Sequence, residues 1–450
     1  MIQAMTQTTV ISASRRSQRL VFIADGTLYM STELAVPVQA SGGSGIVSPS
    51  ATPQLCQISG SGTVFIAERG ANVQKFNAST NAMVSFTAST VAPIPTGCGL
   101  CCIYRNRLVL AGKPGDEQNF FASRQGDYAD FDYAQTDPQA AWAGNSITTG
   151  KLPDIITALI PISDDSLVMG GDHSIHVMRG DPGYGGSIQQ LTDKVGIAGP
   201  EAWTSDGAGN VYFLGQDGLY VMQPGGGPPS NLTAQRVPDF FGILDRNEYY
   251  LQLRWDEKHH GLWIFATTKG NDLSIHLFWD TRNNAFWPMQ FPHEFGPVSS
   301  LVWDADKADA QTPMLGARNN LVQRQDDTAL ADDQTAISSY IQIGPIRPSG
   351  DWRETKFIAL KAVLGELPAT LDSSDWNLVW TANAGDSPYG ALQAASETRT
   401  GTWDAPAIQD PIGLRLTGQS LFIRLSNSTL EKVWSLDRIS VEAVPAGPEG

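Results

Sequence analysis

Residues Arg19–Ser31 read RLVFIADGTLYMS, and residues Asn210–Met222 read NVYFLGQDGLYVM. Both stretches place an apolar run before Asp-Gly, which is followed by Leu-Tyr and a closing apolar residue. Asp-Gly between two apolar runs is a strong hairpin signal, because a type I′ turn needs positive φ at both central residues. Each stretch therefore predicts a β-hairpin.

Weaker copies of the same pattern recur along the chain. They begin at Gly62, Arg107, Ser166, Gly261 and Pro313. Seven hairpins between residues 19 and 335 correspond to about 45 residues per unit, the size of a four-stranded propeller blade. One hairpin leaves apolar faces and strand edges uncovered, so a closed ring of blades is favoured. We predict an all-β fold that begins with a β-propeller of about seven blades; an antiparallel sandwich with similar strand spacing is the alternative.

Trp-Asp pairs recur in the second half of this region, at Trp255-Asp256, Trp279-Asp280 and Trp303-Asp304. The full WD-repeat signature also needs Gly-His before each blade, and these pairs lack it. Each pair follows an apolar residue, which places it at the end of a strand. We therefore interpret the tryptophans as packing residues and the aspartates as turn formers.

The composition changes near residue 325, where Gln325–Gln334 is rich in aspartate and is typical of a linker. The short strands predicted after it fit a C-terminal β-sandwich over residues 336–450. The propeller is assigned to residues 19–335, with an insertion at 113–151 that is polar and dotted with aromatic residues. Residues 1–18 are assigned to an N-terminal arm, which is either mobile or a strand that closes the ring.

The formal net charge of −16 disfavours general binding to phosphate backbones or anionic lipid. No apolar run approaches the roughly 20 residues of a membrane span, and no secretory leader is recognised, so we expect a soluble protein made in a reducing cytoplasm. The cysteines are too few to crosslink the chain, and we expect free thiols at Cys56, Cys98, Cys101 and Cys102.

Signatures of chemistry are weak throughout the sequence. No nucleophile elbow, P-loop, zinc-protease or calcium-loop pattern occurs. His173 and His176 are three residues apart, which on a strand places their rings on opposite faces. We therefore expect no catalytic residue, no metal and no cofactor, and we expect that the protein is not an enzyme.

One segment goes beyond generic β features. Residues Arg107–Phe131 read RLVLAGKPGDEQNFFASRQGDYADF, and the later stretches IITALIPISDDSLVMGGDHSIHVMRGD and VGIAGP follow it. This series resembles the tail nozzle, or packaged-DNA-stabilisation, proteins of short-tailed double-stranded DNA phages. The similarity covers roughly residues 19–330, and the C-terminal region is similar in pattern to the sandwich that often ends such chains.

The resemblance implies a structural subunit of a phage tail, assembled in the host cytoplasm and located in the virion tail. Other copies of the chain would form a ring, with six as the expected number, below the portal and adaptor and next to tail fibres or spikes. This ring would extend the channel that retains and then ejects the genome. Double-stranded DNA would pass without specific binding, and no membrane insertion is expected.

The alternative function is a carbohydrate-binding or depolymerising tail component that contacts the host surface, because a propeller funnel and stacked tryptophans suit sugars. For contacts between subunits, the aromatic residues of the insertion are the candidates. They are Phe120, Phe121, Tyr128, Phe131 and Tyr133. The competing interpretation is that these side chains pack against their own blade.

Overall fold

The computed structural model describes the chain in two compact units, Met1–Gln325 and Asp326–Gly450. The residues it describes are 1–450 apart from 13–14, 33–34, 148–149, 226, 235–240, 243, 271–273, 305–310, 327–328, 330, 333–334, 351–352, 366–375, 394, 405–407, 433 and 447–450. The boundary lies ten residues before the predicted one at 335. The aspartate-rich stretch after Gln325 therefore belongs to the second unit.

The first unit consists of antiparallel sheets whose strands follow one another in sequence. The first three sheets are β1 (Ile2–Ile11), β2 (Arg16–Ala24), β3 (Thr27–Thr32) and β4 (Val38–Gln39); β5 (Gln54–Ile58), β6 (Thr63–Ala67), β7 (Gln74–Asn77) and β8 (Ala82–Val84); and β9 (Leu100–Tyr104), β10 (Arg107–Lys113), β11 (Asp116–Ala122) and β12 (Trp142–Ala143).

The next three sheets also have four strands each, and the sheet after them has three. They are β13 (Ile156–Ser163), β14 (Ser166–Gly171), β15 (Ile175–Arg179) and β16 (Ser187–Thr192); β17 (Trp203–Ser205), β18 (Val211–Leu214), β19 (Leu219–Met222) and β20 (Ser230–Asn231); β21 (Tyr249–Asp256), β22 (Gly261–Thr268), β23 (Ile275–Asp280) and β24 (Ala285–Met289); and β25 (Pro297–Asp304), β26 (Gln311–Ala317) and β27 (Val322–Arg324). Single 3-10 turns are η1 (Gly144–Ser146), η2 (Pro182–Tyr184) and η3 (His293–Phe295).

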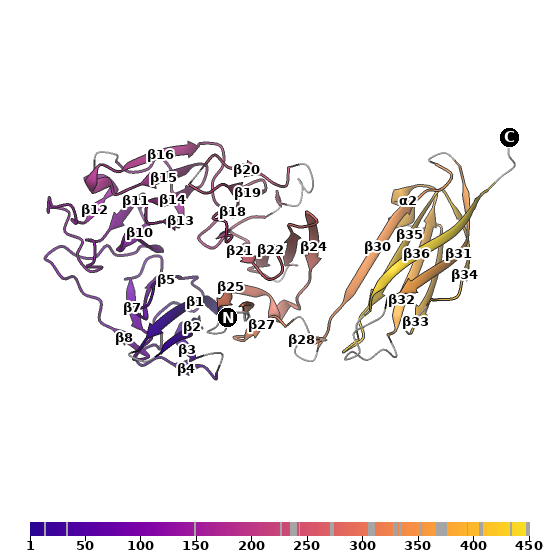
Figure 1. The fold of residues 1–450 in the computed structure, drawn as a ribbon, viewed down its shortest axis with the longest axis horizontal. Coiled ribbons are helices and arrows are strands. Elements are labelled where there is room, and N and C mark those ends of the chain that lie inside the picture. Colours follow the sequence, from indigo (N-terminus) through magenta and orange to yellow (C-terminus); the bar gives the residue numbers. More distant parts are fainter. Residues whose placement is uncertain are drawn as a thin grey trace. The chain divides into compact units, whose positions relative to one another are not determined.

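These sheets surround a common centre (Figure 1). The first strand of a sheet contacts the first strand of its neighbour, as β5 does with β9 and β21 does with β25. Strand β1 contacts both β5 and β25, so the first and last sheets meet and the ring closes. The first unit is therefore a β-propeller, and the prediction of an all-β propeller is confirmed.

Each of the seven predicted hairpins is the pairing of the second and third strands of a sheet. At Asp25-Gly26 both residues have positive φ, 45° and 76°, as a type I′ turn requires. The second Asp-Gly differs. Leu214 pairs with Leu219, and Gly215 donates a 2.9 Å hydrogen bond to the Gly218 carbonyl, so Asp217-Gly218 ends a four-residue loop.

The Trp-Asp pairs end strands β21, β23 and β25, as predicted. The Asp256 carboxylate accepts hydrogen bonds from the Trp263 indole N–H at 3.0 Å and from the His259 backbone N–H at 3.1 Å. The Asp280 carboxylate accepts the Arg282 backbone N–H at 3.0 Å. These two aspartates therefore stabilise the turns that follow their strands.

Of the two alternatives for residues 1–18, the strand that closes the ring is the one observed, because Ile2–Ile11 is the innermost strand of the first sheet and contacts both β5 and β25. Its polar side chains are satisfied inside the ring. The Gln3 amide donates to the carbonyls of Ser48 and Ala51 at 2.7 and 2.6 Å, and its oxygen accepts the Gly26 N–H at 2.6 Å. A strand with such partners does not need the apolar run by which we recognised the others.

The segment 113–151 is not an insertion between blades, because it contains β11 and β12. These are the outer two strands of the third sheet. What is long in this region is the connection between them, residues 123–141. Strand β11 is the second strand of the hairpin predicted from Arg107, and it pairs with β10 through Ala111 and Phe120.

Substitution of Gly26 by Ala is expected to lower the free energy of unfolding by roughly 1–3 kcal/mol. Gly26 has a φ of +76°, and a Cβ placed there would lie 2.3 Å from the Val47 carbonyl oxygen. Gly45 is the matched control, because its φ of +63° carries similar strain with no heavy atom within 4 Å. Urea unfolding of both variants should show the larger loss for Gly26, and equal losses would contradict a role for the Val47 contact.

The second unit forms two larger sheets and a small hairpin. The hairpin is β28 (Ala331–Asp332) with β29 (Thr335–Ala336). One sheet has the order β30 (Ser339–Ile346), β35 (Ser420–Asn427), β32 (Leu378–Gly385) and β33 (Glu397–Trp403), and the other has the order β34 (Ile412–Gly418), β31 (Thr355–Leu364) and β36 (Leu436–Pro445). A short helix is α2 (Pro388–Gln393). Both sheets contribute to one core, which includes Phe357 of β31 and Leu378 of β32. The C-terminal β-sandwich stays a prediction.

Candidate functional site

The centre of the propeller contains two adjoining pockets of about 140 and 480 Å³ among the innermost strands. They share lining residues from β1, β5, β21 and β25 and from the segment before β17. The shared residues are Met5, Gln54, Leu55, Glu201, Arg254 and Ser300. Concave pockets of this kind are where proteins ordinarily hold small ligands.

The charged residues that line the larger pocket are Glu201 and Arg254, and they form an ion pair. The Arg254 guanidinium also donates to the carbonyls of Ser300 and Leu253 at 2.8 and 2.6 Å. The lining is therefore neutral overall, and the acidic balance of the chain is not concentrated there. A paired arginine of this kind joins neighbouring sheets.

The smaller pocket has a more basic lining. Arg246 and Lys269 line it in addition to the paired Arg254 and Glu201. The Lys269 ammonium lies 5.4 Å from the centre of the Tyr250 ring and donates to the Arg246 carbonyl at 2.9 Å. Burial lowers the pKa of Lys269 and raises the pKa of Tyr250, because each charged form loses water. Arg246 is itself paired with Asp172.

Cys56, Cys101 and Cys102 line the larger pocket, and all four cysteines are free thiols. Burial raises the pKa of Cys98 to about 12, and it also raises the pKa of Cys56 and Cys102. These three thiols are therefore protonated at neutral pH and are poor nucleophiles. Within the described ranges no three His, Cys, Asp or Glu side chains come together as metal ligands.

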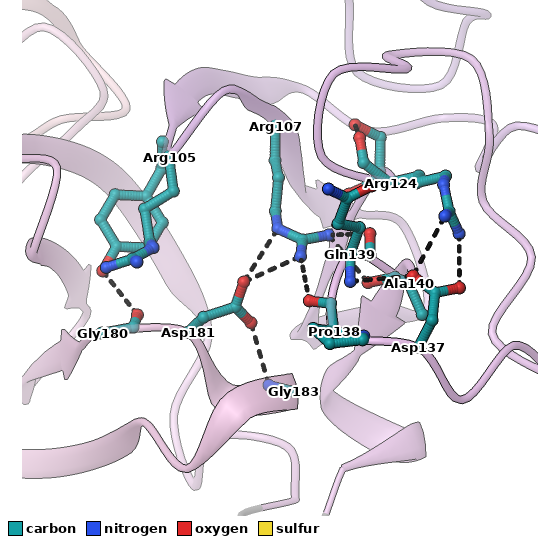
Figure 2. A network of polar contacts seen from close by, with 12 residues as sticks. Arg105, Arg107, Arg124, Asp137, Pro138, Gln139, Ala140, Gly180, Asp181 and Gly183 are labelled. Carbon is teal, nitrogen blue, oxygen red and sulfur yellow. Dashed lines mark hydrogen bonds and ion pairs between the residues drawn. The ribbon is translucent and has the colours of Figure 1, made fainter.

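The segment that carries the phage resemblance is held by a buried arginine, Arg107 (Figure 2). Its guanidinium binds the Asp181 carboxylate through two hydrogen bonds of 3.1 and 2.8 Å. It also donates to the carbonyls of Ser123, Gln139 and Ala140 at 2.8, 3.0 and 2.8 Å. Arg107 thus ties the connection 123–141 to its own sheet and to the turn after β15.

Two further interactions complete this network (Figure 2). The Arg124 guanidinium binds the Asp137 carboxylate through both oxygens, at 2.8 and 3.0 Å, which closes the connection on itself. The Tyr104 hydroxyl donates to the Gly180 carbonyl at 2.7 Å, beside Asp181. The connection is therefore a folded part of the propeller.

The GDYADF stretch forms turns within this connection. The Asp127 carboxylate accepts the Ala129 N–H at 3.0 Å and the Ser89 hydroxyl at 2.7 Å. The Asp130 carboxylate accepts the Asp132 N–H at 2.9 Å. These are Asx turns, in which a carboxylate caps the backbone two residues on. The motif therefore has a structural explanation.

The predicted contact residues do not form a surface patch. Phe120, Phe121 and Phe131 are buried in the cores of the propeller, so in the single chain their rings pack against its own sheets, and contact with another subunit stays a prediction. Tyr128 and Tyr133 are half-buried against the same core as Phe131. The Tyr128 ring lies 5.6 Å from the Phe65 ring. The competing interpretation, packing against the chain's own sheets, explains them because the connection folds back over β10 and β11.

Sequence reasoning missed Arg107 and Asp181 as the centre of the polar network. The signal was available in part, because Arg107 opens an otherwise apolar strand, RLVLAG. A charge in such a strand is rarely buried without a partner. The partner lies 74 residues away, at a distance along the chain that no local pattern joins.

The histidines are strand and turn residues. His173 is exposed and lies within 3.0 Å of the Gln216 amide, while His176 is buried in β15. Burial lowers the pKa of His176. His276 in β23 lies against the rings of Phe265 and Phe291, and within the described part of the chain neither of its ring nitrogens has a hydrogen-bond partner.

The burial of His276 predicts a loss of stability in acid. Burial lowers its pKa from 6.5 to about 4. The unfolded chain therefore takes up a proton before the folded chain does, so the free energy of unfolding is full above pH 6.5 and falls by about 2–3 kcal/mol as the pH decreases toward 4. Urea unfolding at pH 7.5 and 4.5 measures this loss. The variant His276→Phe should lose less between the two pH values, and an equal loss would assign the acid sensitivity to other groups.

No family model matches this chain, and no curated protein matches it. Solved structures with similar folds include the extracellular domain of a hybrid two-component system from B. thetaiotaomicron, with 11% identity and a TM-score of 0.44. The match covers 92% of this chain and 47% of that one, so the chain spans about half the length of that protein. The WD40 β-propeller domain of Doa1 matches with 9% identity over 72% of this chain and 94% of its own, with a TM-score of 0.41. The computationally designed protein Ika8 matches with 12% identity over 72% and 95%, with a TM-score of 0.39.

The assignment of the fold therefore rests on the sheets of this chain and not on these similar structures. Fold and site together describe a β-propeller protein with a second β-rich unit, in which the central pockets share a paired arginine and glutamate and the motif segment is part of the framework. Among the described residues, no helix has the length and apolar character required to cross a membrane.

Proposed function

We propose that this chain is a structural subunit of a bacteriophage tail, of the nozzle type, and that it acts by assembly instead of catalysis. The observation that carries the proposal is the burial of the Arg107–Phe131 segment. This is the segment whose resemblance to tail nozzle proteins suggested the proposal. Arg107 and Phe131, the two ends of that segment, are both buried in the propeller. In a structural subunit, a recurring motif is expected to stabilise the fold and not to carry out a reaction.

The central pockets are compatible with this role. Their one arginine and one glutamate in common are paired with each other, so the propeller centre is braced across its innermost strands. Two of the thiols at its wall, Cys56 and Cys102, are protonated at neutral pH because burial raises their pKa. These features favour a centre that stabilises the ring of sheets.

The charge of the chain supports passage of DNA without binding. Each copy carries a formal net charge of −16, so a ring of six would carry about −96. Duplex DNA has about one negative charge per 1.7 Å of axis, and a ring with a net negative charge repels it. Repulsion allows the genome to slide through a ring placed below portal and adaptor.

The test is a docking experiment with the full chain. Purified protein would be mixed with phage particles that carry portal and adaptor but lack the distal tail, and particle images would be averaged. We expect added ring-shaped density at the channel exit, and no such density on particles that also lack the adaptor. A protein that stays monomeric at high concentration and never docks would contradict the proposal.

A further inference from the structure

The four-stranded sheet of the second unit has one face in the core and one face in solvent. In β35 the side chains of Leu421, Ile423 and Leu425 are buried, while Phe422, Arg424 and Ser426 alternate with them on the other side. The same alternation in β32 places Thr381 and Asn383 on the outer face. This outer face holds a pocket of about 350 Å³.

The strand register gathers the pocket around Arg424. Gln342 of β30 lies directly opposite Arg424 on one side, and Thr381 of β32 lies directly opposite it on the other. Asn383 is opposite Phe422 in the same way. A guanidinium, two amides and a hydroxyl therefore lie side by side across three strands, with spacing that suits a ligand rich in hydroxyl groups.

Two aromatic rings give this polar row an apolar floor. The Arg424 guanidinium lies 4.4 Å from the centre of the Tyr340 ring, a cation–π contact that holds the cation in position. The Phe422 ring packs over Gly344, where a Cβ would lie 2.5 Å from its Cδ1 atom. Only a residue without a side chain allows the ring to lie that close to the strand. Leu392 of α2 contributes to the pocket wall.

The positive charge of Arg424 favours an anionic ligand in this pocket. Arg424 is the one charged residue in the described lining of the pocket. Residues 326–450 carry 17 acidic and 9 basic side chains, a formal net charge of −8, so a central arginine in this setting is unusual. Arg424 forms no ion pair with a carboxylate in the part of the second unit that the structure describes. Its outward N–H groups are therefore available to an anion.

We propose that the outer face of the β30–β35–β32–β33 sheet binds an oligosaccharide that carries a carboxylate, such as a uronate- or sialate-bearing glycan. The sugar carboxylate would pair with Arg424, and the sugar hydroxyls would bond to Gln342, Thr381 and Asn383. The C–H face of a neighbouring sugar would lie on the Phe422 ring. This inference does not rest on the proposed assembly function, because the site lies wholly in the second unit.

The test is binding of the full chain to an array of bacterial polysaccharide fragments that includes uronate- and sialate-bearing members and their methyl esters. We expect binding to acidic members and at least tenfold weaker binding to the esters, because esterification removes the charge at nearly constant shape. Calorimetry with the best acidic fragment then compares variants. Arg424→Met is expected to weaken binding at least tenfold, and Phe422→Ala is expected to weaken it several-fold.

Arg438→Met is the matched control, because Arg438 is an exposed arginine on β36 in the other sheet. It should bind as the parent protein does, and circular dichroism should show that all variants are folded. Absence of binding to every acidic fragment, binding that survives esterification, or equal effects of the two arginine variants would each overturn the proposal. A failure of this test leaves the docking experiment unaffected, so the two proposals are separable.

Discussion

Replacement of Arg107 by methionine is expected to lower the free energy of unfolding of the first unit by about 3–5 kcal/mol. Methionine has a similar length and no donors, so the Asp181 carboxylate is left buried without its cation. The carbonyls of Ser123, Gln139 and Ala140 lose the same donor. When a buried polar group loses its partner, the loss of folding free energy exceeds the net contribution of the intact pair, because water does not reach the group to replace the partner.

Urea unfolding followed by tryptophan fluorescence measures this effect, and a double-mutant cycle assigns it. The variant Arg107→Met with Asp181→Asn should recover part of the loss, since no charge then remains buried. Arg105→Met is the control, because Arg105 is partly exposed, its partner Asp165 is exposed, and the loss of such a pair should change stability by less than about 1 kcal/mol. A similar small change for Arg107→Met would show that the network does not hold the connection.

Replacement of Phe131 by alanine is expected to cost about 3–5 kcal/mol in free energy of unfolding. The Phe131 side chain is fully buried in a core that also contains Phe65 and Leu108, and truncation leaves a cavity there. Soluble yield and the urea midpoint should both fall. Tyr128→Ala is the control, because Tyr128 is only half-buried against that core and should lose clearly less.

The same variants distinguish packing from contact between subunits. If Phe131→Ala keeps the parent stability and loses only its ability to dock on phage particles, then Phe131 is a subunit contact and the packing explanation is wrong. If stability and docking fall together, the aromatic residue acts through the fold of its own chain.

The local sequence pattern was sufficient to predict the hairpins. Arg19–Ser31 predicts its strands and its turn because strand alternation and positive φ at Asp25-Gly26 are properties of neighbouring residues. The same reasoning located the Trp-Asp turns. It gave the wrong turn type at Asp217-Gly218, where the pairing of Leu214 with Leu219 determines the loop length.

The sequence left residues 1–18 open between a mobile arm and a strand for a physical reason. Thr and Gln in β1 are unremarkable by composition, and their burial depends on partners that the ring brings together. The Gln7 amide donates to the Asp304 carbonyl at 2.8 Å, and the Ser299 hydroxyl donates to the Ile2 carbonyl at 2.9 Å. Both contacts join residues 297 positions apart, so only closure of the ring decides between a mobile arm and a strand for residues 1–18.

For the candidate sites, too, some features follow from the sequence and others only from the tertiary structure. The sequence alone determined that the chain is built from short paired strands, because turn chemistry and apolar alternation act over a few residues. Only the tertiary structure decided that Arg107 lies buried on Asp181 and that Arg424 stands among amides on an outer sheet face. The energy of a charged side chain depends on what surrounds it in space, and residues far apart in the chain supply those surroundings.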